Sequence, residues 1–292
     1  MRRLLSALVV LGLIGLTVFW FVTAPPAALA AVPQGEAERG ERIFWAAGCA
    51  SCHVEEGAPD GALPVLGGGK RFDTPFGQFV APNISSDPVH GVGAWSDDEL
   101  VTAIVQGVSP EGEHYFPAFP YTSYGLAEVS DIADLVAFMR TLPASQRPSE
   151  AHDVPFPFNV RRSVGGWKLL FRPTSYATVM PDGPAQRGQY LAEALAHCGE
   201  CHTPRGPLGN QLRDRWMAGA PNPSGKGNIP NITPAELDWS ERDVQEYLTS
   251  GFTPEFDTAG GSMALVVEHT ARLPEEDRAA LAAYVKALAP AE

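Results

Sequence analysis

Two short motifs of cysteine and histidine carry the reactive groups of this 292-residue chain. All four cysteines lie in these motifs, which read Cys49-Ala50-Ser51-Cys52-His53 and Cys198-Gly199-Glu200-Cys201-His202. Two thiols on one helical turn can add to the two vinyl groups of haem, and a histidine directly after them lies under the iron. The sequence therefore predicts two covalently attached haem c groups, with His53 and His202 as metal ligands and with thioether bonds to Cys49, Cys52, Cys198 and Cys201.

Other roles of paired cysteines fit these motifs less well. A thioredoxin-like redox pair needs no histidine, and a closed zinc site would place its two cysteine pairs about 15–20 residues apart. A disulfide within Cys-x-x-Cys would close a small, strained loop and would add little stability. None of these roles predicts a histidine after both pairs.

The two halves of the chain match beyond the haem motifs, which indicates a duplicated domain. Residues 35–40 parallel residues 183–188, the Pro-Asn-Ile turn at 82–84 parallels that at 230–232, and Trp95-Ser96 parallels Trp239-Ser240. Each serine is predicted to cap a helix with acidic residues in its first turn. Each half ends in a segment with helical spacing of apolar residues, and neither shows the alternation expected of a sheet.

The predicted fold is all-α, with an N-terminal membrane or signal segment at 1–31 and tandem cytochrome c domains at 33–143 and 181–290. Residues 144–180 form the linker, in which prolines are frequent and helical periodicity is weak. Its aromatic content favours an irregular strap that packs across both domains, while a strap that wanders over the surface remains the alternative. The aromatic residues in question are Phe156, Phe158, Trp167, Phe171 and Tyr176.

The two units differ at the position expected for the sixth iron ligand. Met263 lies in a glycine-rich loop before the last helix of the second unit and is predicted to ligate its iron. Counting twelve positions from Gly107 and from Gly251 places Phe119 where Met263 stands, and phenylalanine cannot bind iron.

Three possibilities follow for the first haem. His114 from the same loop could ligate the iron, another residue such as His90 could do so, or the iron could be five-coordinate and open to a small molecule. Met139, Tyr115, Tyr121 and Tyr124 are weaker candidates, and His152, His197 and His269 are expected on the surface. Methionine raises the reduction potential and bis-histidine ligation lowers it, so electrons would enter at the first haem and leave from the second.

The N-terminus predicts export from the cytoplasm. Arg2 and Arg3 precede an uncharged run from Leu4 to Val22, which is long enough for a membrane anchor, although Ala28-Leu29-Ala30 also fits a signal cleavage site. We expect a retained anchor that leaves the rest of the chain on the periplasmic side of the bacterial inner membrane, or a soluble periplasmic protein if the segment is cleaved. A net charge of −13 disfavours nucleic acid as a partner.

The haem motifs, the Pro-Asn-Ile turns, the Trp-Ser helices and the Tyr-Phe-Pro-Ala-Phe-Pro-Tyr segment at 115–121 resemble the cytochrome c subunits of bacterial membrane-bound alcohol, gluconate and sorbitol dehydrogenases. The resemblance covers roughly residues 33–290. It implies electron transfer from a dehydrogenase subunit, as protein donor, to a respiratory acceptor that is a protein or is linked to quinone. Those subunits carry three haems on longer chains, and many have methionine where Phe119 stands, so the particular dehydrogenase stays open.

Two classes of function fit these features. The first is an electron carrier without catalysis of its own, whose two irons are both six-coordinate. The alternative is a haem enzyme, such as a peroxidase or small-molecule oxidoreductase, that works at an open first haem with His114 as a polar group beside the bound ligand.

Overall fold

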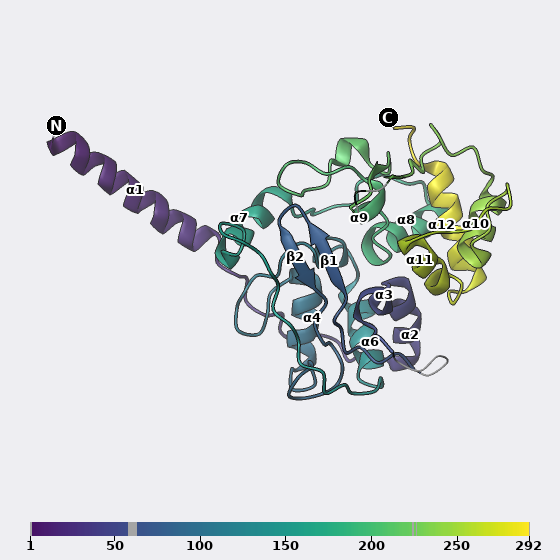
Figure 1. Cartoon of the computed structure of the whole chain (residues 1–292), viewed down its shortest axis with the longest axis horizontal. Helices are drawn as coiled ribbons and strands as arrows, with labels where there is room; N and C mark the ends of the chain where they lie inside the picture. Colours follow the sequence, from purple (N-terminus) through teal and green to yellow (C-terminus); the bar gives the residue numbers. More distant parts are fainter. Residues whose placement is uncertain (1, 58–62, 224, 226, 292) are drawn as a thin grey trace.

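A computed structural model describes residues 2–57, 63–223, 225 and 227–291, so Met1 of the predicted N-terminal segment lies outside the described residues. Helix α1 (Arg2–Val22) projects as a single rod from a body of two helical units, as Figure 1 shows. No residue of α1 is buried against the body, and its length and apolar composition suffice to cross a membrane.

The first unit is built from helices and one hairpin. Helix α2 leads to α3, which carries the first haem motif, and the hairpin β1–β2 separates α3 from the remaining helices. The bounds are α2 (Ala37–Ala46), α3 (Cys49–His53), β1 (Arg71–Thr74), β2 (Gly77–Val80), α4 (Asp97–Gln106), α5 (Tyr121–Tyr124) and α6 (Val129–Met139).

The second unit repeats this plan. Helix α8 runs on into the π-helix η1, and α9 then carries the second motif. The bounds are α8 (Pro184–Gln189), η1 (Tyr190–Leu195), α9 (Gly199–His202), the 3₁₀ turn η2 (Arg213–Arg215), β3 (Ala220–Pro221), β4 (Asn228–Ile229), α10 (Glu241–Ser250), α11 (Ser262–Thr270) and α12 (Glu275–Ala287).

The expectation of a fold without strands needs correction. Strands β1 and β2 pair antiparallel from Arg71↔Val80 to Thr74↔Gly77, and the shorter pair β3–β4 stands at the corresponding place in the second unit. The strands have four and two residues, too few for an alternating pattern to stand out in a sequence.

The linker also contains a helix, α7 (Arg161–Phe171), which the sequence did not indicate. Gly165 and Gly166 interrupt its apolar pattern, and both lie against the end of α1. The linker contacts both units. Its Lys168 Nζ donates to the carbonyl of Gly107 in the first unit at 2.6 Å, and its Thr178 carbonyl accepts from Gln189 Nε2 of the second unit at 2.6 Å. Residues 144–180 thus form a packed segment with one helix.

The same helix crossing holds each unit together. Helix α2 crosses α6 at Gly40, where an added Cβ would lie 1.9 Å from the carbonyl oxygen of Asp134. Helix α8 crosses α12 at Gly188, where a Cβ would lie 1.9 Å from the carbonyl oxygen of Ala280. The glycine in each repeated segment therefore lets two backbones touch.

We expect Gly40→Ala to lower the free energy of unfolding by at least about 3 kcal/mol, because α2 and α6 must separate to admit the methyl group. Thermal unfolding of the haem-loaded protein, followed by circular dichroism, measures the effect. Gly260→Ala is the matched control, since no atom lies within 4 Å of the Cβ position at Gly260. Equal melting temperatures for the two variants would contradict this account of the crossing.

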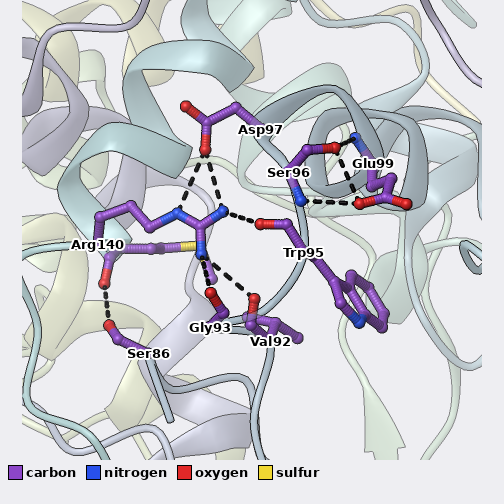
Figure 2. Close-up of polar contacts among 9 residues, drawn as sticks. Ser86, Val92, Gly93, Trp95, Ser96, Asp97, Glu99 and Arg140 are labelled. Carbon is purple, nitrogen blue, oxygen red and sulfur yellow. Dashed lines mark hydrogen bonds and ion pairs between the residues drawn. The ribbon is translucent and has the colours of Figure 1, made fainter. Parts of the chain in front are cut away.

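The predicted Trp-Ser caps are confirmed. The Oγ of Ser96 accepts from the backbone N–H of Glu99 at 3.3 Å, and Ser240 caps α10 through Asp243 in the same way. Arg140, at the end of α6, donates to the carbonyl oxygen of Trp95 at 2.5 Å and to Asp97 at 3.0 Å (Figure 2). The cap of α4 is thereby fixed to the terminal helix of its unit.

The two units share one apolar core and a polar contact across it. Asp277 of α12 is 1% exposed and pairs with Arg187 of its own unit at 3.1 Å and with Arg42 of the first unit at 2.5 Å. Ser51, inside the first motif, lies 3.0 Å from His269 Nδ1 of the second unit. These contacts fix the two haem motifs relative to each other.

Candidate haem sites

Each motif begins after a residue in the left-handed conformation. Gly48 precedes Cys49 with φ of 65°, and His197 precedes Cys198 with φ of 44°. The turn brings the chain from the preceding helix into the short helix of the motif, so both cysteines and the histidine share about one turn. Glycine adopts this conformation without cost, whereas His197 is held there by a 3.1 Å contact of its Nδ1 with the Leu195 carbonyl.

The motif histidines are oriented by backbone carbonyls. Nδ1 of His53 lies 2.8 Å from the carbonyl oxygen of Pro82, and Nδ1 of His202 lies 2.9 Å from that of Pro230. A carbonyl can only accept, so Nδ1 carries the proton and Nε2 keeps its lone pair. Burial also lowers the pKa of both imidazoles, which favours the neutral form that can ligate iron.

The repeated Pro-Asn-Ile turns thus have a physical task, and their expected role as structural turns is confirmed. Asn83 and Asn231 are 3% and 7% exposed. Their side-chain oxygens accept from the backbone N–H of Ser85 and Thr233, and their amides donate to carbonyls that follow the terminal helices. The turn that holds each motif histidine is anchored to the end of its own unit.

The cysteines also suit covalent haem attachment. All four are free thiols in the described chain, and no disulfide joins either pair. Burial raises the pKa of Cys49 and of Cys198 to about 12. When bound, haem supplies an iron that gains and loses one electron, and the protein sets its potential through axial ligands and burial. Paired thiols beside a neutral imidazole with a free Nε2 fit this group.

The structure supports the register that equates Phe119 with Met263. The backbone N–H of Tyr115 donates to Gly107 and that of Ala259 donates to Gly251, both at 2.8 Å. Phe119 N–H then donates to the residue three positions earlier, as does Met263 N–H. Met263 lies in the first turn of α11 rather than in the loop that the sequence suggested, because the helix begins at Ser262.

His114 has contacts that differ from those of an iron ligand. Its Nε2 lies 2.9 Å from the carbonyl oxygen of Thr23, at the end of α1, and its ring is 3% exposed. In the repeat it corresponds to Thr258, since Val108↔His114 and Phe252↔Thr258 form equivalent bridges. The ring lies at the junction of α1 and α7, which Figure 1 draws well away from α3. Ligation by His114 would require this hydrogen bond to break.

The other candidates for the first iron differ in their surroundings. The hydroxyl of Tyr124 donates to the carbonyl of Ala47 at 2.8 Å. Lys168 Nζ lies 4.4 Å from the centre of the Tyr121 ring, while the buried Tyr121 hydroxyl has no hydrogen-bond partner within the described residues. Met139 is buried in the core on α6. The expectation that His269 lies on the surface is wrong, because this residue is 5% exposed and contacts Ser51 and Trp45 across the domain interface. A single histidine without a partner pattern carries no sequence signal for such a contact.

The segments that lead into the two motifs meet at the interface of the units. The Tyr124 hydroxyl donates to the carbonyl of Ala47, two residues before Cys49, at 2.8 Å, and the Tyr124 ring lies 5.8 Å from that of His197, directly before Cys198. The Thr122 hydroxyl in α5 donates to Glu200, inside the second motif, at 3.2 Å. Neither contact between the units has a signature in the sequence, because each depends on how the units pack.

Comparison with known proteins agrees with this description. The profile of the cytochrome c family matches the chain twice, at residues 37–143 and 185–289. The chain therefore belongs to the cytochrome c family, and two such domains of a di-haem protein imply two covalently bound haem c groups and a role in electron transfer.

The similar individual proteins are a di-haem cytochrome and cytochrome subunits of dehydrogenases. The chain is 55% identical to a "Diheme cytochrome c-type" protein of Cereibacter sphaeroides over 98% of both chains. It is 34% identical to the fructose dehydrogenase cytochrome subunit of Gluconobacter japonicus, with 86% of this chain and 52% of that subunit aligned. The gluconate 2-dehydrogenase cytochrome c subunit of Pantoea cypripedii is 32% identical over 86% of this chain and 59% of its own length. The chain thus spans about half the length of these dehydrogenase subunits.

Proposed function

We propose that this cytochrome receives single electrons from a periplasmic or membrane-bound dehydrogenase at its first unit and delivers them from its second unit to a respiratory acceptor. The observation that carries the proposal is that both motifs contact the interface of the units, where Tyr124 lies 5.8 Å from the His197 ring and Thr122 donates to Glu200 at 3.2 Å. Direct contact between the surroundings of the two motifs favours transfer between the irons over catalysis at either one.

The proposed ligand sets follow from the site. His53 and His202 bind the two irons through Nε2, Cys49 with Cys52 and Cys198 with Cys201 form the thioethers, and Met263 is the sixth ligand in the second unit. Methionine raises the potential of the iron it binds. The second haem therefore has the higher reduction potential, and electron transfer runs from the first unit to the second.

The test of this function uses membranes that contain the protein. Ethanol, gluconate and fructose are offered in turn, since relatives belong to alcohol, gluconate and fructose dehydrogenases. We expect one of them to reduce both haems, visible as the absorbance bands of ferrous haem c. In the Met263→Ala variant the second haem should stay mostly oxidised. Reduction by none of these substrates, together with rapid turnover of hydrogen peroxide, would favour a peroxidase instead.

We propose further that α1 is retained as the membrane anchor. Thr23, directly after α1, is 1% exposed, and it accepts hydrogen bonds from His114 and from Arg162 Nε. Cleavage after Ala30 would remove these acceptors and would leave the buried His114 without a partner at Nε2, at a cost of about 1–3 kcal/mol. A segment meant for removal has no reason to complete the packing of the mature protein.

The anchor is tested by the mass of the protein isolated from its own cells. We expect an intact mass that includes α1, and we expect detergent, but not high salt, to release the protein from membranes. A soluble periplasmic protein whose chain begins at Ala31 would contradict the proposal.

A second candidate function rests on Phe119, because an iron with no sixth ligand could bind a small molecule. Carbon monoxide distinguishes this small-molecule role from electron transfer alone, since it binds an open ferrous iron and leaves a six-coordinate iron unchanged.

A further inference from the structure

Helix α7 packs one face against the end of α1. A Cβ at Gly165 would lie 2.4 Å from the carbonyl oxygen of Thr23, and one at Gly166 would lie 3.7 Å from Cγ2 of the same threonine. Arg162, one turn earlier, places its guanidinium carbon 4.4 Å from the centre of the Trp20 ring and donates to Thr23 Oγ1 at 3.1 Å. This face of α7 is therefore fixed where α1 meets the body (Figure 1).

Two leucines continue the same face. Leu169 follows Gly165 by four residues and Leu170 follows Gly166 by four, so each lies one turn further along the side that contacts α1. Their side chains are 64% and 73% exposed, although leucine is among the residues most often buried. Two large apolar side chains thus stand uncovered beside the end of a helix of membrane-spanning length.

The charge of this segment differs from that of the whole protein. The chain carries a net charge of −13, yet residues 154–181 contain no Asp or Glu. Three arginines of this segment, Arg161, Arg162 and Arg172, are partly exposed, whereas Lys168 is buried and donates to the carbonyl of Gly107. Further apolar side chains, Phe156 and Phe158, are exposed just before α7. Exposed leucine and phenylalanine next to cations are typical of helices that lie in the interface of an anionic bilayer.

We propose that α7 lies in the plane of the membrane surface and inserts Leu169 and Leu170 into the boundary between phospholipid headgroups and acyl chains. The inference rests on the retention of α1 stated under the proposed function. Phospholipid is the occupant because the leucines continue the side of α7 whose preceding turn contacts the end of the membrane helix. An anchor of one helix leaves the body free to rotate, and a second contact through α7 holds the two-haem body in one orientation.

The experiment uses the full-length, haem-loaded protein in vesicles of phosphatidylethanolamine and phosphatidylglycerol. With the four native cysteines bound to haem, a Leu170→Cys variant has one free thiol for a nitroxide label. Phe256→Cys is the matched control, because Phe256 is 89% exposed and lies between α10 and α11, which Figure 1 draws at the opposite end of the body from α1. Electron paramagnetic resonance of the oxidised protein, which needs no reductant that would destroy the nitroxide, then compares collisions of each label with oxygen, which concentrates in lipid, and with a water-soluble nickel complex, each against the same sample under argon.

At position 170 we expect more collisions with oxygen than with nickel, and the reverse at position 256. Equal, water-like behaviour at both positions in protein that floats with the vesicles would overturn the proposal for α7 and leave the anchor intact. A label at 170 that avoids both reagents in native membranes would indicate a protein occupant and would overturn the assignment to lipid. Protein that does not float with the vesicles would overturn the anchor, and with it this inference.

Discussion

A Cys198→Ser, Cys201→Ser double variant should carry one covalent haem per chain instead of two. Serine hydroxyls do not add to haem vinyl groups, so the second motif loses both thioether bonds while the first keeps its own. The absorbance of the denatured protein in alkaline pyridine measures covalent haem, and the intact mass gives the number of groups directly. Cys49→Ser, Cys52→Ser is the matched variant for the first unit.

The expected loss is confined to one unit because each motif is served by its own turn. Pro82 orients His53 and Pro230 orients His202, and neither histidine depends on the other unit for this bond. Retention of two covalent groups in either double variant would contradict the assignment of the cysteines. Should a double variant fail to accumulate, the single Cys201→Ser change leaves one thioether, and a shift of the ferrous absorbance band then reports the lost bond.

How far the sequence predicts this structure depends on whether a feature is local or repeats in a recognisable motif. The haem motifs, the Trp-Ser caps and the Pro-Asn-Ile turns occur twice, and their local hydrogen bonds follow from residue type and spacing. Asn83 is one example, because a buried asparagine after proline can accept from its own chain two residues on. Such features need no knowledge of long-range packing.

Features that depend on long-range packing were not predicted. Helix α7 lacks a counterpart, and its glycines make sense only beside Thr23, which is more than a hundred residues away. The contact of His269 with Ser51 likewise depends on how the two units dock. For His114, proximity in sequence to Phe119 predicts ligation, and this stays a prediction; the bridge to Val108 places the residue at a position equivalent to Thr258.

The sixth ligands give the second large effect. Met263→Ala should lower the potential of the second haem by about 0.1 V or more, a modest part of the roughly 0.8 V range over which axial ligands tune haem iron. The methionine donor that raises the potential is lost, and the ferrous iron should then bind carbon monoxide. A redox titration followed by absorbance separates the two haems. An unchanged potential and no carbon monoxide binding would exclude Met263 as the ligand.

Phe119→Met tests the same position in the other unit. The hydrogen bonds of Tyr115 to Gly107 and of Ala259 to Gly251 align the two repeats, so a methionine at position 119 would occupy the position equivalent to Met263. We expect the first haem to rise in potential by a similar amount and to lose any reaction with carbon monoxide. His114→Ala is the control, and because its Nε2 contacts Thr23 we expect it to leave the spectrum of the first haem unchanged. If His114→Ala instead opens the first iron to carbon monoxide, His114 is the ligand, and its bond to Thr23 must break when haem binds.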